Sequence, residues 1–109
     1  MDINNFNEDD YNEMLMGMIV NGGDARDTAL KAIQAAKKGN FEEAEELLKN
    51  CDETLLEAHQ IRTSMIQSEI NGEYIPMMSM MVHAQDILMD AMAIKDMAVE
   101  FVELYKRLS

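Results

Sequence analysis

The sequence predicts an all-α protein, an antiparallel up-down-up bundle of three helices. Its 109 residues are rich in alanine, leucine, methionine, glutamate and lysine, which favour helices, and include one proline and five glycines. Apolar residues recur every three or four positions through three long segments, a spacing that lines one face of a helix. Glycines separate these segments, so we expect short connections and antiparallel neighbours.

The first predicted helix runs from near Asp9 to Lys38 and is followed by Gly39, a residue type that often ends helices. Residues 1–8 are expected to be a disordered tail, which leaves residues 9–109 as one domain. The apolar face of this helix is predicted to comprise Leu15, Met18, Ile19, Gly22, Ala25, Ala29, Ala32, Ile33 and Ala36.

Two adjacent glycines lie inside the first predicted helix. Gly22 and Gly23 follow Asn21, and glycine is a poor helix former. Because glycine has no side chain, it also lets two helices approach closely. We therefore expect a bend or a close contact between helices at this point.

The second predicted helix begins after Asn40, which we expect to act as its N-cap in a capping box with Glu43. It should end near Asn71-Gly72, a pair typical of helix ends. Its apolar face is predicted to comprise Ala44, Leu47, Leu48, Cys51, Leu55, Ala58, Ile61, Met65 and Ile66.

The third predicted helix has Pro76 at its first position and extends from Met77 to Leu108. Its main apolar stripe is predicted to comprise Met77, Met80, Met81, Ala84, Ile87, Leu88, Ala91, Ile94, Ala98, Val102 and Tyr105. A second stripe beside it comprises Ser79, His83, Asp86, Asp90, Ile94, Met97 and Phe101. Two stripes on one helix suggest that one packs within the chain and the other against another subunit, so we expect a homo-oligomer with this second stripe near its interface.

Composition argues against several classes of partner. The chain has 9 basic and 21 acidic residues, a formal charge of −12, which opposes binding to nucleic acid or to an anionic membrane and favours a protein with a basic face. No apolar run is long enough to insert into a membrane, and the acidic first residues do not resemble a signal peptide. The lone Cys51 is expected to pack as a small apolar side chain in a reducing compartment, so we predict a cytoplasmic protein.

The stretch His83-Ala84-Gln85-Asp86 is the candidate for chemistry. Its imidazole and carboxylate, three residues apart, share one face of an otherwise apolar helix, where burying them is costly unless they are paired or solvated. A neutral imidazole is a nucleophile that can hold a phosphoryl group if partners can reach it. The alternative is a core or interface histidine that hydrogen-bonds to a carbonyl or carboxylate.

Other polar residues allow metal binding or a simple structural role. Asp86 and Asp90 share the stripe of His83; brought together from several subunits they would repel one another and suit Mg²⁺, or they form a solvated acidic flank. His59 either lines a groove facing His83 or fills a boundary position. Methionines beside His83 could hold Cu(I) or form an adaptable surface for a partner. No zinc motif or phosphate-binding loop is present.

Four short motifs occur in order along the predicted helices: Gly23-Asp24-Ala25-Arg26, Gly39-Asn40-Phe41, Glu57-Ala58-His59 with Thr63, and Val82-His83-Ala84-Gln85-Asp86 with Leu88-Met89. With these motifs the chain resembles, from about Tyr11 to Leu108, the lactose/cellobiose-specific IIA components of the bacterial phosphoenolpyruvate-dependent sugar phosphotransferase system. The resemblance implies a phosphoryl carrier, a transferase component that functions in the uptake of a lactose- or cellobiose-type disaccharide. His83 would accept phosphate from the histidine phosphocarrier protein and pass it to the IIB component. The resemblance also implies a homotrimer with Asp86 at its axis, where a divalent cation such as Mg²⁺ binds.

The sequence departs from the family pattern at two positions. Ile87 stands where family members often have a second histidine, and Asp90 where they often have threonine. The resemblance leaves His83 and Asp86 in place. Gln85, a neighbouring subunit or the partner could supply hydrogen-bond donors to the phosphoryl group, and the roles of His59 and Arg26 stay open. An IIA paralogue that has drifted to another role, or a non-catalytic helical module that binds partners through a methionine-rich face, are the alternative functions.

Overall fold

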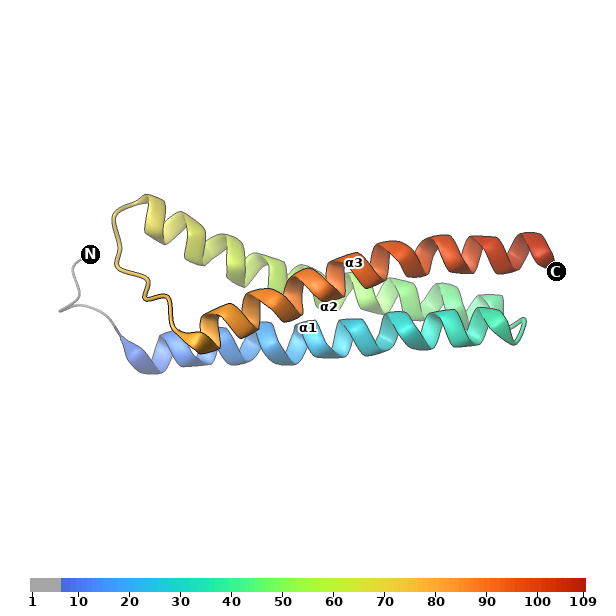
Figure 1. Ribbon diagram of the computed structural model, residues 1–109, viewed down its shortest axis with the longest axis horizontal. Helices are drawn as coiled ribbons and strands as arrows, with labels where there is room; N and C mark the ends of the chain where they lie inside the picture. Colours follow the sequence, from blue (N-terminus) through green and yellow to red (C-terminus); the bar gives the residue numbers. More distant parts are fainter. Residues whose placement is uncertain (1–6) are drawn as a thin grey trace.

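The computed structural model describes residues 7–109, and in this range the chain forms three long helices and no strand (Figure 1). They are α1 (Glu8–Lys37), α2 (Phe41–Ile70) and α3 (Ser79–Leu108). Figure 1 shows that the helices run up, down and up. The bundle measures 59 × 21 × 19 Å. The predicted all-α three-helix architecture is confirmed. The first six residues of the predicted tail lie outside the described range.

The start of α1 is fixed by a local cap. The side chain of Asn7 accepts a hydrogen bond from the backbone N–H of Asp10 at 3.1 Å, so the helix begins at Glu8, one residue before the predicted start. The first turn is acidic, which suits the positive end of the helix dipole.

Glycines end α1 and α2 as predicted. Gly39 and Gly72 have φ angles of +84° and +90°, a conformation that other residues rarely adopt. Each donates its N–H back to the preceding helix, Gly39 to the carbonyl of Ala36 and Gly72 to that of Glu69, both at 3.0 Å. These bonds satisfy carbonyl groups that a helix end would otherwise leave without partners.

The predicted capping box at the start of α2 is wrong. Asn40 occupies the N-cap position, but its side chain makes no capping hydrogen bond. In a capping box the Glu43 carboxylate would accept a hydrogen bond from the backbone N–H of Asn40. This N–H instead donates to the carbonyl of Ala35 at 2.9 Å. The tight turn out of α1 therefore uses the donor that the capping box requires.

The start of α3 is also wrong in the sequence prediction. The helix begins at Ser79, so Pro76 lies in the connector rather than at the first helical position. Pro76 is buried, and its carbonyl accepts a 2.6 Å hydrogen bond from the hydroxyl of Tyr11. Met78 is extended, with ψ of 165°. The hydrogen bond to Tyr11 thus holds Pro76 in the connector, and α3 begins three residues later, at Ser79.

The core combines small residues, mostly alanine, with large side chains from all three helices. Alanines supply more than half of the buried positions of α1, and Leu15, Met18, Leu88 and Val102 are the large side chains sealed most completely. Three predicted core residues are exposed: Ile66 (42 %), Met77 (74 %) and Met80 (47 %). Ile66 lies next to the buried Met65 and points away from the buried face of α2. Figure 1 shows that the end of α2 diverges from the start of α3. Met77 lies outside α3, and Met80 lies beside its buried face.

The close contact predicted at the glycine pair is confirmed at Gly22. This residue is buried, and the helix continues through it without interruption while α3 lies against it. No helix among residues 7–109 combines the length and the apolar character needed to cross a membrane.

Cys51 packs in the core, as predicted. It is fully buried, and its thiol donates to the carbonyl of Ala25 at 3.2 Å. Burial, with a smaller contribution from the neighbouring Asp52 carboxylate, raises the pKa of the Cys51 thiol to about 11. At neutral pH the group is a thiol and not a thiolate, which makes it a poor nucleophile.

Candidate functional site

Core packing of the first turns of α3 determines which residues face outward. Met81, Ala84 and Leu88 are each 2 % exposed or less, so they form the face of α3 that packs into the bundle. His83 and Asp86 lie on another face of the helix and are exposed. The side chain that the sequence singled out is therefore open to an approaching partner.

The His83 side chain is exposed and makes no hydrogen bond or ion pair with any residue in the range 7–109. The interpretation of His83 as a core histidine is wrong for the single chain, because its side chain is exposed. Nor do His83 and Asp86 form an ion pair with each other. Solvation, rather than pairing, removes the cost that the sequence suggested.

The electrostatic setting of His83 is favourable to an anion. His83 lies within the second turn of α3, and helical side chains lean toward the N-terminus of their helix. The first turn of α3 contains no acidic residue, and Met78 at the N-cap provides no side-chain cap. Free backbone N–H groups and the positive end of the helix dipole thus lie on the side toward which the imidazole leans.

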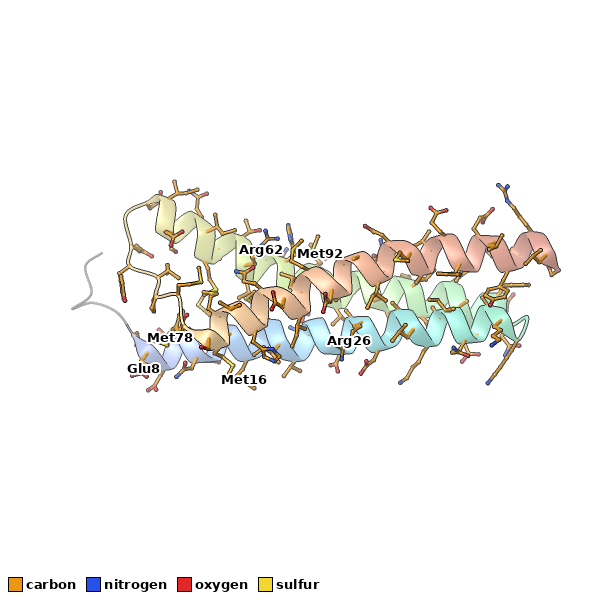
Figure 2. The ribbon with its side chains drawn as sticks, in the orientation of Figure 1. Glu8, Met16, Arg26, Arg62, Met78 and Met92 are labelled. Carbon is orange, nitrogen blue, oxygen red and sulfur yellow. The ribbon has the colours of Figure 1, made fainter. Side chains whose placement is uncertain are left out.

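Nearby polar side chains are engaged elsewhere. Gln85 is partly buried and donates from Nε2 to the sulfur of Met81 at 3.6 Å. Arg26 of α1, labelled in Figure 2, pairs with its neighbour Asp27 at 3.6 Å. Neither side chain is directed to His83 by any of these contacts. The chain's own charges therefore offer His83 little besides the helix end.

His59 does not share a site with His83. It is exposed on α2 and lines a groove of about 230 Å³ between α2 and α3. The other lining residues are Asp52, Leu55, Leu56, Met92, Lys95 and Asp96, and Figure 2 labels Met92. Within this groove Lys95 and Asp52 form an ion pair of 2.9 Å, and this contact raises the pKa of Lys95. The groove of His59 and the face of His83 are separate features.

The predicted cation ligands are not gathered within one chain. Asp86 and Asp90 are exposed, and neither is in an ion pair with a residue of the range 7–109. In the same range no group of three or more His, Cys, Asp or Glu side chains could hold a metal ion. Mg²⁺ takes near-octahedral oxygen coordination, so a site at Asp86 would need carboxylates from other subunits, together with water.

The contact that sets the start of the helix carrying His83 was missed from sequence. Tyr11 is 3 % exposed and ties α1 to the connector through Pro76. One signal was available, because Tyr11 lies four residues before Leu15 and extends the apolar stripe of α1 by one turn.

Comparison with known proteins identifies the family. The family described as "PTS system, Lactose/Cellobiose specific IIA subunit" matches residues 13–106. The chain is 44% identical over 101 residues to the lichenan-specific phosphotransferase enzyme IIA component of Bacillus subtilis, covering 93% of this chain and 92% of the relative. It is 47% identical over 100 residues to the cellobiose-specific EIIA component of Lactococcus lactis, covering 92% and 86%.

Solved structures agree with this match. The crystal structure of the cellobiose-specific enzyme IIA from Bacillus anthracis superposes with a TM-score of 0.87 at 41% identity, covering 90% of each chain. The IIA(Chitobiose)–HPr complex of Escherichia coli gives a TM-score of 0.78 at 33% identity, covering 90% of this chain and 95% of that one. The chain therefore belongs to the lactose/cellobiose-specific IIA family of the phosphotransferase system.

Proposed function

We propose that this chain is a cytoplasmic phosphoryl carrier in which His83 accepts a phosphoryl group from the histidine phosphocarrier protein and passes it to IIB. The sugar taken up would be a lactose- or cellobiose-type disaccharide, in line with the names of the cellobiose-specific and lactose-specific relatives. Support for the donor comes from the Escherichia coli chitobiose relative, solved in complex with HPr. The observation that carries the proposal is the exposed imidazole of His83, free of intrachain partners among residues 7–109, beside the uncapped start of α3.

The proposed reaction is two in-line phosphoryl transfers. A neutral ring nitrogen of His83 attacks the phosphorus of the donor phosphohistidine; a new N–P bond forms while the donor's N–P bond breaks and its imidazole leaves. A cysteine thiolate of IIB then attacks the same phosphorus, which forms an S–P bond and frees His83. Such transition states are loose, so catalysis depends on position and on stabilising negative charge.

In this reaction the chain would hold His83 in position and would supply the partial positive charge of the start of α3. The buried face of α3 fixes the helix, and the uncapped N–H groups of its first turn favour the phosphoryl oxygens electrostatically. With a net charge of −12, the chain itself has few cations to add, so further stabilisation would come from the partner.

We propose that the carrier assembles as a homotrimer with Asp86 near its axis. Exposed apolar side chains continue along the C-terminal half of α3, including Met97 (58 %), Phe101 (40 %) and Leu104 (50 %), and burial in an interface would remove them from water. The exposed Asp86 carboxylate, which has no ion-pair partner among residues 7–109, has the hard oxygen donors that Mg²⁺ prefers. Three copies of Asp86 would hold the cation and lose their mutual repulsion.

The test is phosphoryl uptake measured by intact mass. The chain is incubated with phosphoenolpyruvate, the general phosphotransferase enzyme and the histidine carrier, beside His83→Ala and the control His59→Ala, which removes the other histidine. We expect one phosphoryl group on the parent and on His59→Ala and none on His83→Ala, with all three folded and assembled alike. Uptake by His83→Ala would reject His83 as the acceptor.

A second candidate function is a non-catalytic interaction module. It is favoured by one observation: Met77, Met78 and Met80 are 74, 40 and 47 % exposed beside the start of α3, a surface able to adapt to a partner. A drifted paralogue would share this surface. Both predict a parent chain that takes up no phosphoryl group in the assay.

A further inference from the structure

The closest approach of α3 to α1 at a glycine lies one turn after His83. Gly22 is buried in α1, and Ile87 of α3 sits against it. A Cβ atom at position 22 would stand 2.7 Å from Cγ2 of Ile87. It would also stand 3.6 Å from the backbone carbon of Ile87 and from the backbone nitrogen of Leu88. The space above Gly22, which we call the Gly22 notch, is therefore filled by Ile87 and leaves no room for a methyl group.

The Gly22 notch differs from the other glycine positions inside α1. Cγ2 of Ile87 is attached to a branched Cβ, whose χ1 angle is stiff in a helix, so the clash would reach the backbone of α3. At Gly17 a Cβ would meet only Cδ1 of Ile61, at 2.9 Å, which is the far end of a side chain of α2. At Gly23 nothing lies within 4 Å. Only the substitution at Gly22 would push on α3.

A displacement of Ile87 reaches His83 directly. The two residues are four apart on α3 and share one face. In an α-helix the N–H of residue 87 donates to the carbonyl of residue 83, so the two turns move together. No hydrogen bond from residues 7–109 holds the His83 ring. The place of the imidazole therefore depends on how this turn of α3 packs.

We infer that Ile87, seated in the Gly22 notch, is a positioning residue for His83. It fixes the distance of α3 from α1 and so the point at which the imidazole is presented for phosphoryl transfer. The inference rests on the proposed function, and it gives a physical role to the isoleucine that departs from the family pattern.

Three alanine substitutions in one helix test the inference. Gly22→Ala should slow phosphoryl transfer to His83 by about ten- to a hundredfold at saturating donor, since small displacements of reacting groups cost this much. The NMR titration of the His83 ring should change as well. Gly23→Ala should transfer within about twofold of the parent rate. Gly17→Ala should lower thermal stability through its contact with Ile61 and leave the rate and the His83 titration unchanged.

Combining Gly22→Ala with Ile87→Ala tests whether the lost rate of phosphoryl transfer can be recovered. Ile87→Ala removes Cγ2 and should itself slow transfer, because the Gly22 notch is then empty; Gly22→Ala with Ile87→Ala refills it and should recover most of the lost rate. A folded Gly22→Ala with the parent rate and titration would overturn the positioning role. If Gly22→Ala does not fold, Ile87→Ala decides: an unchanged rate overturns the inference. A parent chain without phosphoryl uptake would overturn the proposed function instead.

Discussion

Replacing Tyr11 with phenylalanine should loosen the connector that leads into the helix of His83. The substitution removes only the hydroxyl, which donates a 2.6 Å hydrogen bond to the buried carbonyl of Pro76. The phenol is 3 % exposed, and burial raises the pKa of Tyr11. Losing one member of a buried pair leaves the other unsatisfied, which costs about 1–3 kcal/mol, so we expect a loss of about 2 kcal/mol in the free energy of unfolding.

The assay is urea and thermal denaturation followed by circular dichroism. For a domain of about 100 residues, 2 kcal/mol corresponds to a fall in Tm of about 8 °C or more. Tyr105→Phe is the matched control, because Tyr105 is partly buried against the core and its hydroxyl makes no hydrogen bond within residues 7–109. It should change stability by less than about 0.5 kcal/mol. Equal stability of the two variants would refute the claim that the Tyr11–Pro76 bond holds the connector.

Other substitutions and a pH change test the assembly and the core. Asp86→Asn should raise Tm in the presence of a chelator if carboxylates crowd a trimer axis; a lower Tm would mean that the carboxylate makes a needed hydrogen bond. Leu88→Ala should cost about 3 kcal/mol because Leu88 is fully buried, whereas Leu56→Ala, at a 54 % exposed position, should cost far less in denaturation experiments. Burial raises the pKa of Cys51 from 9.0 to about 11, so above pH 9 the unfolded chain releases a proton that the folded chain keeps. Stability should therefore fall between pH 9 and 11, and Cys51→Ala should flatten this fall; an identical pH profile would contradict it.

The helices could be predicted because each carries an apolar period, and because a glycine marks the end of α1 and of α2. Gly39 and Gly72 adopt the positive φ angles that their positions implied, and the stripe through Leu15 and Met18 is buried. The predictions that were wrong, the capping box at Asn40 and the start of α3 at Pro76, depended on contacts with other segments of the chain. The sequence places Pro76 at a helix start because it does not reveal the hydrogen bond from the Tyr11 hydroxyl, 65 residues away, to the Pro76 carbonyl. It predicts a capping box at Asn40 because it does not reveal that the Asn40 N–H donates to the carbonyl of Ala35 in the preceding turn.

At the candidate site, too, local sequence features could be predicted and features that depend on tertiary packing could not. The sequence makes His83 a candidate site residue but does not predict its exposure, because a stripe along a helix does not say whether water, another helix or another subunit covers it. Ile66 illustrates the point: its spacing fits the apolar face of α2, yet it is 42 % exposed while the adjacent Met65 is buried. The groove of His59 depends on which helices are neighbours, which one helical pattern does not reveal.

The alanines of α1 have a consequence for how this protein can change. Ala25, Ala29 and Ala32 are fully enclosed, so a larger side chain there would wedge the helices apart. Outward positions such as Met16 and Val20, about half exposed, carry no such restriction within the chain. New surface properties can therefore be acquired by substitution on the exterior of α1, whereas its enclosed alanines must stay small.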